Sequence, residues 1–131
     1  MRTLIVDDDF SCRLLAQRII SAIGECDGAA NGKEALEAFR LAWEEGQPYD
    51  LVLLDILMPG MDGHATLARI RDAEKEMGVP EGVKVIMLTG VVDHKNVSSA
   101  FMGGCEAYLI KPVDKEKLLE QIRLLGFLGE K

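Results

Sequence analysis

Two patterns of apolar residues alternate along this chain. Short, uninterrupted apolar runs are typical of strands that a parallel sheet buries on both faces, and longer stretches with apolar residues three or four positions apart are typical of amphipathic helices. The predicted strands are residues 3–6, 25–30, 51–54, 83–88 and 106–110. The predicted helices are residues 10–23, a helix capped by Asn31 with Glu34 at the capping-box position, and residues 64–77, 93–103 and 114–125.

Helical spacing predicts which side of each helix is buried. In the first helix the apolar face comprises Cys12, Leu15, Ala16, Ile19, Ala22 and Ile23. Phe10 and Leu14 fall on its polar side and are candidates for a docking patch, unless they are merely scattered exposed residues or Phe10 tucks under the first turn. Trp43 is expected to pack in the core and His64 to be solvated.

Strand and helix alternate five times, which predicts one α/β domain. Such a chain forms a doubly wound, five-stranded parallel sheet with right-handed crossovers and helices on both faces. Ligands of these sheets bind outside the carboxyl ends of the strands. The helix at residues 93–103 has few apolar side chains to bury and is therefore only thinly anchored.

Composition limits the classes of partner. The 131 residues, 48% of them hydrophobic, suit one domain, and the absence of a linker, repeat or low-complexity stretch leads us to expect a single domain over residues 1–131 without an output domain. A net charge of −7 argues against direct binding to nucleic acid or an anionic membrane. The cysteines are odd in number and form no C-x-x-C pair, which favours a reducing compartment over a disulfide framework. With no signal peptide or membrane span in the sequence, we expect a cytoplasmic location.

Polar residues follow four of the five predicted strands. Asp7 and Asp8 follow the first, Asp55 the third, Thr89 the fourth and Lys111 the fifth. Because the carboxyl ends of parallel strands meet at one edge, these side chains should gather there. Three neighbouring carboxylates repel one another unless a hard cation binds them, and Mg²⁺ with its preference for oxygen ligands is the expected cofactor.

The same edge carries two groups suited to a phosphoryl group, the Lys111 ammonium and the Thr89 hydroxyl. A carboxylate such as that of Asp55 can act as the nucleophile that forms an acyl phosphate. Taken singly, each residue has a plainer explanation, since a lone Asp is most often a helix cap and a lone Lys a solvated charge. Their joint position at successive strand ends favours the chemical interpretation.

Four segments carry a family resemblance that extends over essentially the whole chain. They are LIVDDD at 4–9, LLDILMPGMDG at 53–63, LTG at 88–90 and YLIKP at 108–112. In these segments the chain resembles the receiver domains of two-component response regulators, and it is similar to stand-alone chemotaxis regulators. The resemblance implies a flavodoxin-like fold with strand order 2-1-3-4-5.

The resemblance also implies a role for each residue at the strand ends. Asp55 would accept the phosphoryl group, and Mg²⁺ would bind to Asp8, Asp55 and the backbone carbonyl of Leu57, with Asp7 assisting through water. Thr89 would move to hydrogen-bond the phosphoryl group, Lys111 would pair with it, and Tyr108 would rotate inward. The Lys111-Pro112 bond would be a cis peptide.

The function expected from these roles is a phosphorylation-activated signalling switch. A histidine kinase or histidine phosphotransfer protein would dock at Phe10 and Leu14 and phosphorylate Asp55, which would reposition the face formed by the fourth helix, last strand and last helix. That face would engage a downstream protein, and the chain would be a monomer or a phosphorylation-dependent dimer. The only catalysis expected is of its own phosphorylation and dephosphorylation.

Two alternatives belong to other classes of protein. A Mg²⁺-dependent phosphohydrolase acting on outside substrates would need a general acid, and no second acid near Asp55 in the sequence offers one. A flavin- or nucleotide-binding protein would need a glycine-rich loop where Asp7, Asp8 and Asp9 stand.

Leu57 and Val91 are apolar where receiver domains often carry polar side chains. Both positions lie two residues after a site residue, Asp55 or Thr89. We expect them to restrict the approach of water and so to prolong the phosphorylated state.

Overall fold

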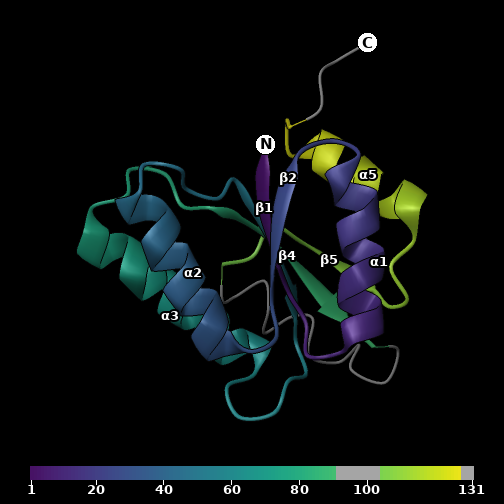
Figure 1. Ribbon diagram of the computed structural model, residues 1–131, viewed down its shortest axis with the longest axis horizontal. Helices are drawn as coiled ribbons and strands as arrows, with labels where there is room; N and C mark the ends of the chain where they lie inside the picture. Colours follow the sequence, from purple (N-terminus) through teal and green to yellow (C-terminus); the bar gives the residue numbers. More distant parts are fainter. Residues whose placement is uncertain (91–103, 128–131) are drawn as a thin grey trace.

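The computed structural model describes residues 1–90 and 104–127. These two ranges contain a parallel sheet with helices on both of its faces (Figure 1). The predicted helix at residues 93–103 lies outside them.

The sheet has the predicted doubly wound topology. Its five parallel strands lie in the order β2-β1-β3-β4-β5, so β2 and β5 are the edge strands. The strands are β1 (Arg2–Val6), β2 (Glu25–Ala29), β3 (Leu51–Asp55), β4 (Lys84–Thr89) and β5 (Ala107–Ile110). The central strand β3 is buried along its whole length, as its unbroken run of aliphatic residues predicts.

Four helices are described, two on each face of the sheet (Figure 1). They are α1 (Phe10–Ser21), α2 (Gly32–Glu44), α3 (Gly63–Met77) and α5 (Lys115–Leu124). Each starts after an Asp or Asn whose side chain accepts from a backbone N–H of the first turn. Asn31 caps α2 as predicted, because its side chain accepts from the backbone N–H of Glu34. The Glu34 side chain accepts from the backbone N–H of Ala30, one residue before the cap, rather than from that of Asn31 as in a capping box.

The hydrophobic core is divided by the sheet into two clusters. One cluster lies between the sheet and the pair α2 and α3, and includes Phe39, Leu67 and Ile70. The other lies between the sheet and the pair α1 and α5, and includes Ile20 and Leu118. Burial on both faces of the sheet explains why its strands lack the alternation seen in half-exposed sheets.

The predicted buried face of α1 was partly wrong. Leu15 is 40% exposed and Ala22 is exposed too, whereas Ile20, which was not placed on that face, is fully buried beside Ala16 and Ile19. At about 100° per helix residue, Leu15 and Ile20 lie on opposite margins of the apolar stripe. The predicted stripe was therefore displaced toward the Leu15 margin, because packing rotates the helix so that its Ile20 margin faces the sheet.

Two other side-chain predictions need correction. Trp43, predicted to be core, is only half-buried, and the Nε2 atom of His64, predicted to be solvated, is buried. Among the described residues, no helix is long and apolar enough to cross a membrane. Cys12, Cys26 and Cys105 are all free thiols, as predicted.

Candidate functional site

The carboxyl edge of the sheet gathers the predicted acidic side chains. Asp7 and Asp8 follow β1, and Asp55 is the last residue of the neighbouring strand β3. One carboxylate oxygen from each of the three residues lies within 4.8 Å of the others. Their burial differs, because Asp7 and Asp55 are buried, at 0% and 4% exposure, and Asp8 is exposed.

The loop after Asp55 folds back closely onto the end of β3. The backbone N–H of Gly63 donates to the carbonyl of Ile56 at 2.7 Å, while the N–H of Ile56 donates to the carbonyl of Leu88 on β4 at 2.9 Å. A Cβ atom at position 63 would overlap the carbonyl oxygen of Asp55 and lie 2.6 Å from the Cα of Ile56. Only glycine therefore lets the loop approach the acidic residue this closely.

The three consecutive acids after β1 have three different environments. The Oδ1 atom of Asp7 accepts from the backbone N–H of Asp9 at 2.9 Å, and Asp9 in turn caps α1 by accepting from Ser11 and Cys12. Asp8, between them, remains exposed. Arg13, which the sequence interpretation did not single out, donates to the backbone carbonyl of Asp7 at 2.7 Å and holds the turn in place.

Lys111 reaches across the edge of the sheet to two of the acids. Its Nζ atom lies 2.9 Å from Oδ2 of Asp7 and 3.4 Å from Oδ2 of Asp55. The backbone N–H of Lys111 donates to the carbonyl of Thr89 at 2.7 Å, which continues the pairing of β5 with β4. The bond to Pro112 is cis, as the family resemblance implied.

Burial sets the protonation of this cluster. Burial, and then the charge of Asp7, raise the pKa of Asp55 to about 7, although the ammonium of Lys111 acts in the opposite direction. Burial also opposes the charge of Lys111, but its hydrogen bond to Asp7 and the charges of Asp55 and Asp7 together raise the pKa of Lys111. Lys111 is therefore cationic at neutral pH, and the Asp55 carboxylate is held in an unfavourable environment that a further cation would relieve.

The acidic cluster fits a magnesium ion. Asp7, Asp8 and Asp55 offer the carboxylate oxygens that Mg²⁺ prefers, and the exposure of Asp8 leaves the cluster open to solvent. Mg²⁺ keeps several waters, so it suits an open site with few protein ligands. Participation of the Leu57 carbonyl and the water-mediated role of Asp7 stay predictions.

The two predicted switch residues occupy neighbouring strands. Thr89 ends β4, is fully buried, and its hydroxyl donates to the carbonyl of Gly90 at 3.1 Å. Tyr108 lies on β5 opposite Met87 and packs, half-buried, against the core on the α2 and α3 side. Their movement on phosphorylation stays a prediction.

The predicted docking residues lie close to the site on α1. Phe10 is 65% exposed, so it does not tuck under the first turn, and the Arg13 guanidinium lies 5.5 Å from the centre of its ring. Leu14 is half-buried. Leu57 is 55% exposed in the loop after Asp55, and Val91 lies outside the described residues.

Comparisons with known proteins agree on the family of the chain. Residues 3–123 match the family described as the response regulator receiver domain. A two-component response regulator of Oryza sativa subsp. japonica is 35% identical over 90% of this chain and 88% of its own length. The chemotaxis protein CheY of Treponema pallidum is 32% identical over 92% of this chain and 79% of its own length.

Solved structures show the same fold. The receiver domain of NtrX from Brucella abortus has a TM-score of 0.78 at 27% identity, covering 93% of this chain and 95% of that one. Some relatives are much longer: the chain spans 7% of a hybrid signal transduction histidine kinase of Dictyostelium discoideum and 47% of a probable transcriptional regulator of Cyanophora paradoxa. The receiver unit is what these proteins share with it, and the chain belongs to the response regulator receiver domain family.

Proposed function

We propose that this chain is a phosphorylation-activated signalling switch in which Asp55 accepts a phosphoryl group from a histidine kinase or a histidine phosphotransfer protein. The observation that carries the proposal is the placement of the Lys111 ammonium between two buried carboxylates, 3.4 Å from that of Asp55. Asp55 lies at the carboxyl edge of the sheet, where ligands of doubly wound folds bind. A magnesium ion held by Asp7, Asp8 and Asp55 would neutralise negative charge on the transferred group.

The chain's own residues account for the transfer step. A carboxylate oxygen of Asp55 forms a bond to phosphorus while the bond from phosphorus to the donor nitrogen breaks, and the leaving imidazole takes up a proton. Lys111 stabilises the charge on the phosphoryl oxygens, and Thr89 supplies a hydroxyl at the end of the adjacent strand. The buried position of Asp55 limits competing water.

Phosphorylation changes the charge balance at the edge of the sheet. The new group carries nearly two negative charges at neutral pH, and Lys111 can no longer satisfy Asp7 and Asp55 as it does now. Movement of Thr89 and Lys111 would in turn move β5 and α5. Together with the helix predicted at residues 93–103, these two elements form the proposed output face. The kinase-docking role of Phe10 and Leu14 rests on their position beside the site.

Incubation with acetyl phosphate and Mg²⁺, followed by intact-mass measurement, tests the proposal. We expect a gain of one phosphate that Asp55→Asn abolishes and that a chelator of divalent cations suppresses. Asp72→Asn removes an exposed carboxylate of α3 and should leave the gain intact. If the wild-type protein gains no phosphate, the switch proposal is wrong. If it turns over an outside phosphoester many times, the phosphohydrolase alternative gains support instead.

A further inference from the structure

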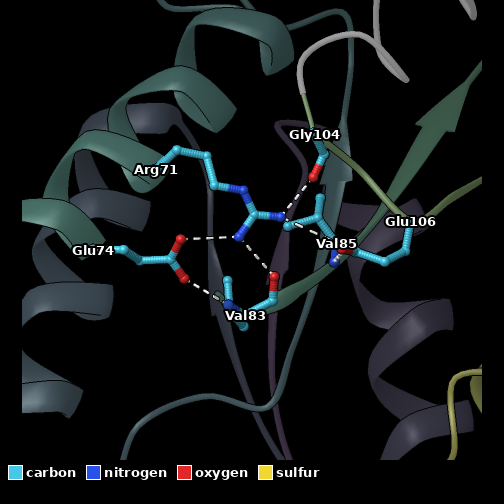
Figure 2. A network of polar contacts seen from close by, with 6 residues as sticks. All are labelled: Arg71, Glu74, Val83, Val85, Gly104 and Glu106. Atoms are coloured by element: carbon cyan, nitrogen blue, oxygen red, sulfur yellow. Dashed lines mark hydrogen bonds and ion pairs between the residues drawn. The ribbon is translucent and has the colours of Figure 1, made fainter. Parts of the chain in front are cut away.

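A second polar cluster lies at the opposite end of the sheet, where β4 and β5 begin. Its centre is Arg71 on α3, with Glu74 on the same helix and Glu106 directly before β5 (Figure 2). We call these three side chains the Arg71 clasp. The acids at the carboxyl ends of the strands do not contact it, so the function proposed above leaves its presence unexplained.

The clasp fixes the start of β4 to α3. Val83, the residue before β4, has both of its backbone polar groups bonded to side chains of that helix. Its N–H donates to Oε2 of Glu74 at 2.5 Å, and its carbonyl accepts from Nη1 of Arg71 at 2.8 Å. The same Nη1 lies 2.9 Å from Oε1 of Glu74, whose side chain is only 7% exposed. Arg71 and Glu74 therefore satisfy both backbone polar groups of Val83, as a neighbouring strand would.

The same guanidinium also holds the chain that leads into β5. Nη2 of Arg71 donates to the carbonyl of Gly104 at 2.6 Å and lies 3.6 Å from Oε1 of Glu106. That Oε1 accepts from the backbone N–H of Val85 at 2.6 Å, while the N–H of Glu106 donates to the carbonyl of Val85 at 2.9 Å. One planar side chain therefore joins the beginnings of two adjacent strands (Figure 2).

Strand pairing fixes the register of β5 only weakly, so an anchor at its start matters. It has four residues, lies at the edge of the sheet, and within residues 1–90 and 104–127 pairs only with β4. A slip of one residue would move it by about 3.3 Å along β4 and turn its side chains to the other face. Lys111 follows β5 directly, so the register of this strand determines whether Nζ reaches Asp7 and Asp55.

We propose that Arg71 is a positioning residue for Lys111, acting from the far end of β5 through the register of that strand. The effect on phosphorylation rests on the function proposed for Lys111, whereas the effect on register does not. Space for the clasp is itself maintained by the backbone, because a Cβ atom at Gly82 would lie 2.7 Å from Nη1 of Arg71 and 3.1 Å from Oε1 of Glu74.

The structural part of the proposal is tested by amide hydrogen exchange. Arg71→Met keeps most of the apolar stem and removes the guanidinium, and it should accelerate exchange at the N–H of Lys111, which is bonded to Thr89, by at least about tenfold. The N–H of Asp7, bonded to Ala29 between β1 and β2, should be unaffected. Arg40→Met removes an exposed ion pair with Glu76 and is the matched control, with no change expected.

A double-mutant cycle tests the link to Lys111. Arg71→Met should slow phosphorylation by acetyl phosphate roughly tenfold, in line with the effect of small misplacements of catalytic groups. In a Lys111→Met background the same change should have little further effect, because the side chain that Arg71 positions is gone. If Arg71→Met acted only through a general loss of stability, it would slow phosphorylation equally in the wild-type and the Lys111→Met backgrounds.

Two more variants keep the test decisive if Arg71→Met unfolds. Arg71→Lys retains the positive charge, but a single ammonium group cannot bond to the carbonyls of both Val83 and Gly104. It should therefore restore less than half of the phosphorylation rate that Arg71→Met loses. Gly82→Ala crowds the clasp without removing any polar group and should reproduce the accelerated exchange at Lys111. Unchanged exchange at Lys111 in Arg71→Met and Gly82→Ala, or equal slowing in both backgrounds, overturns the proposal. Failure of the wild-type protein to accept phosphate would overturn only the function proposed for the site.

Discussion

Replacing Asp55 by Asn should stabilise the protein, even though it removes the proposed phosphoacceptor. Burial and the nearby Asp7 raise the pKa of Asp55 from 3.8 to about 7 in the folded chain. Unfolding returns the carboxyl to water and to its ordinary pKa, so at neutral pH the ionised group favours the unfolded state. Asn has nearly the same shape and carries no charge.

The magnitude follows from the size of the shift. A rise of roughly three pKa units at about 1.4 kcal/mol per unit gives an upper limit of about 4 kcal/mol. The contribution of Lys111, which lowers the pKa, is already contained in that value. Because Asn must leave some of the site's hydrogen bonds weaker, we expect a gain of about 2–4 kcal/mol at pH 8 in metal-free buffer.

The sign of the pH dependence distinguishes this cause from better packing. Between the unfolded and folded pKa values, the folded state binds more protons than the unfolded state, so wild-type stability falls relative to the Asn variant as pH rises from about 4 to about 7. Above about pH 7 the difference should level off, and below about pH 4 the part of the difference that comes from ionisation should vanish. Added Mg²⁺ should narrow the gap, since the carboxylate gains a partner.

Urea denaturation of both proteins at several pH values between about 5 and 8 measures the difference in the free energy of unfolding. Asp72→Asn, which removes an exposed carboxylate, should change stability by less than about 0.5 kcal/mol throughout. A difference that does not change with pH, or an Asn variant less stable than wild type at pH 8, would refute the reasoning from desolvation.

Two further predictions concern the loop after Asp55. Gly63→Ala should lower the free energy of unfolding, measured by urea denaturation, by about 1–3 kcal/mol. The added Cβ atom would meet the backbone of Asp55 and Ile56, which cannot move aside as a side chain can. Leu57→Asn should speed loss of the phosphoryl group up to about tenfold, equivalent to ~1.4 kcal/mol of barrier, by admitting and orienting water beside Asp55; phosphate release from the phosphorylated protein measures it.

Each of these changes has a control in the chain. At Gly28 the three atoms nearest to an added Cβ belong to the side chains of Gln17 and Arg13, which can move aside, so Gly28→Ala should cost clearly less than Gly63→Ala. Equal costs would contradict the packing argument. For Leu57, the comparison is with Leu41→Asn, which replaces an exposed leucine of α2. If Leu57→Asn leaves the rate of loss unchanged or slows it, the hypothesis that this side chain restricts water is wrong.

The order of strands and helices could be predicted because its signals are local. Runs such as residues 51–54 are apolar without interruption, and Asn31 and Asp62 cap the helices that follow them. The predicted bounds differ from the observed ones by only a residue or two at most ends. The positions of Asp7, Asp55 and Lys111 at strand ends followed in turn, because parallel strands bring their carboxyl ends to one edge.

Other features depend on contacts between residues far apart in the chain. An acid on a helix, such as Glu74, is normally expected to face solvent, yet Glu74 is buried against Arg71 and the backbone of Val83. The choice between Leu15 and Ile20 on α1 was likewise decided by the angle at which the helix meets the sheet. Periodicity defines an apolar stripe, but it does not fix the rotation of the helix on its neighbours.

The sequence by itself determined the alternating α/β architecture, the edge of the sheet at which we propose that phosphoryl transfer takes place and the acidic residues that gather there, since each rests on residue type and spacing. Only the tertiary structure decided that Lys111 pairs with Asp7 at 2.9 Å as well as with Asp55, and that Arg71 joins α3 to the beginnings of β4 and β5. The physical reason is that hydrogen bonds and desolvation depend on distances of a few ångströms between segments distant in sequence, and packing alone sets those distances.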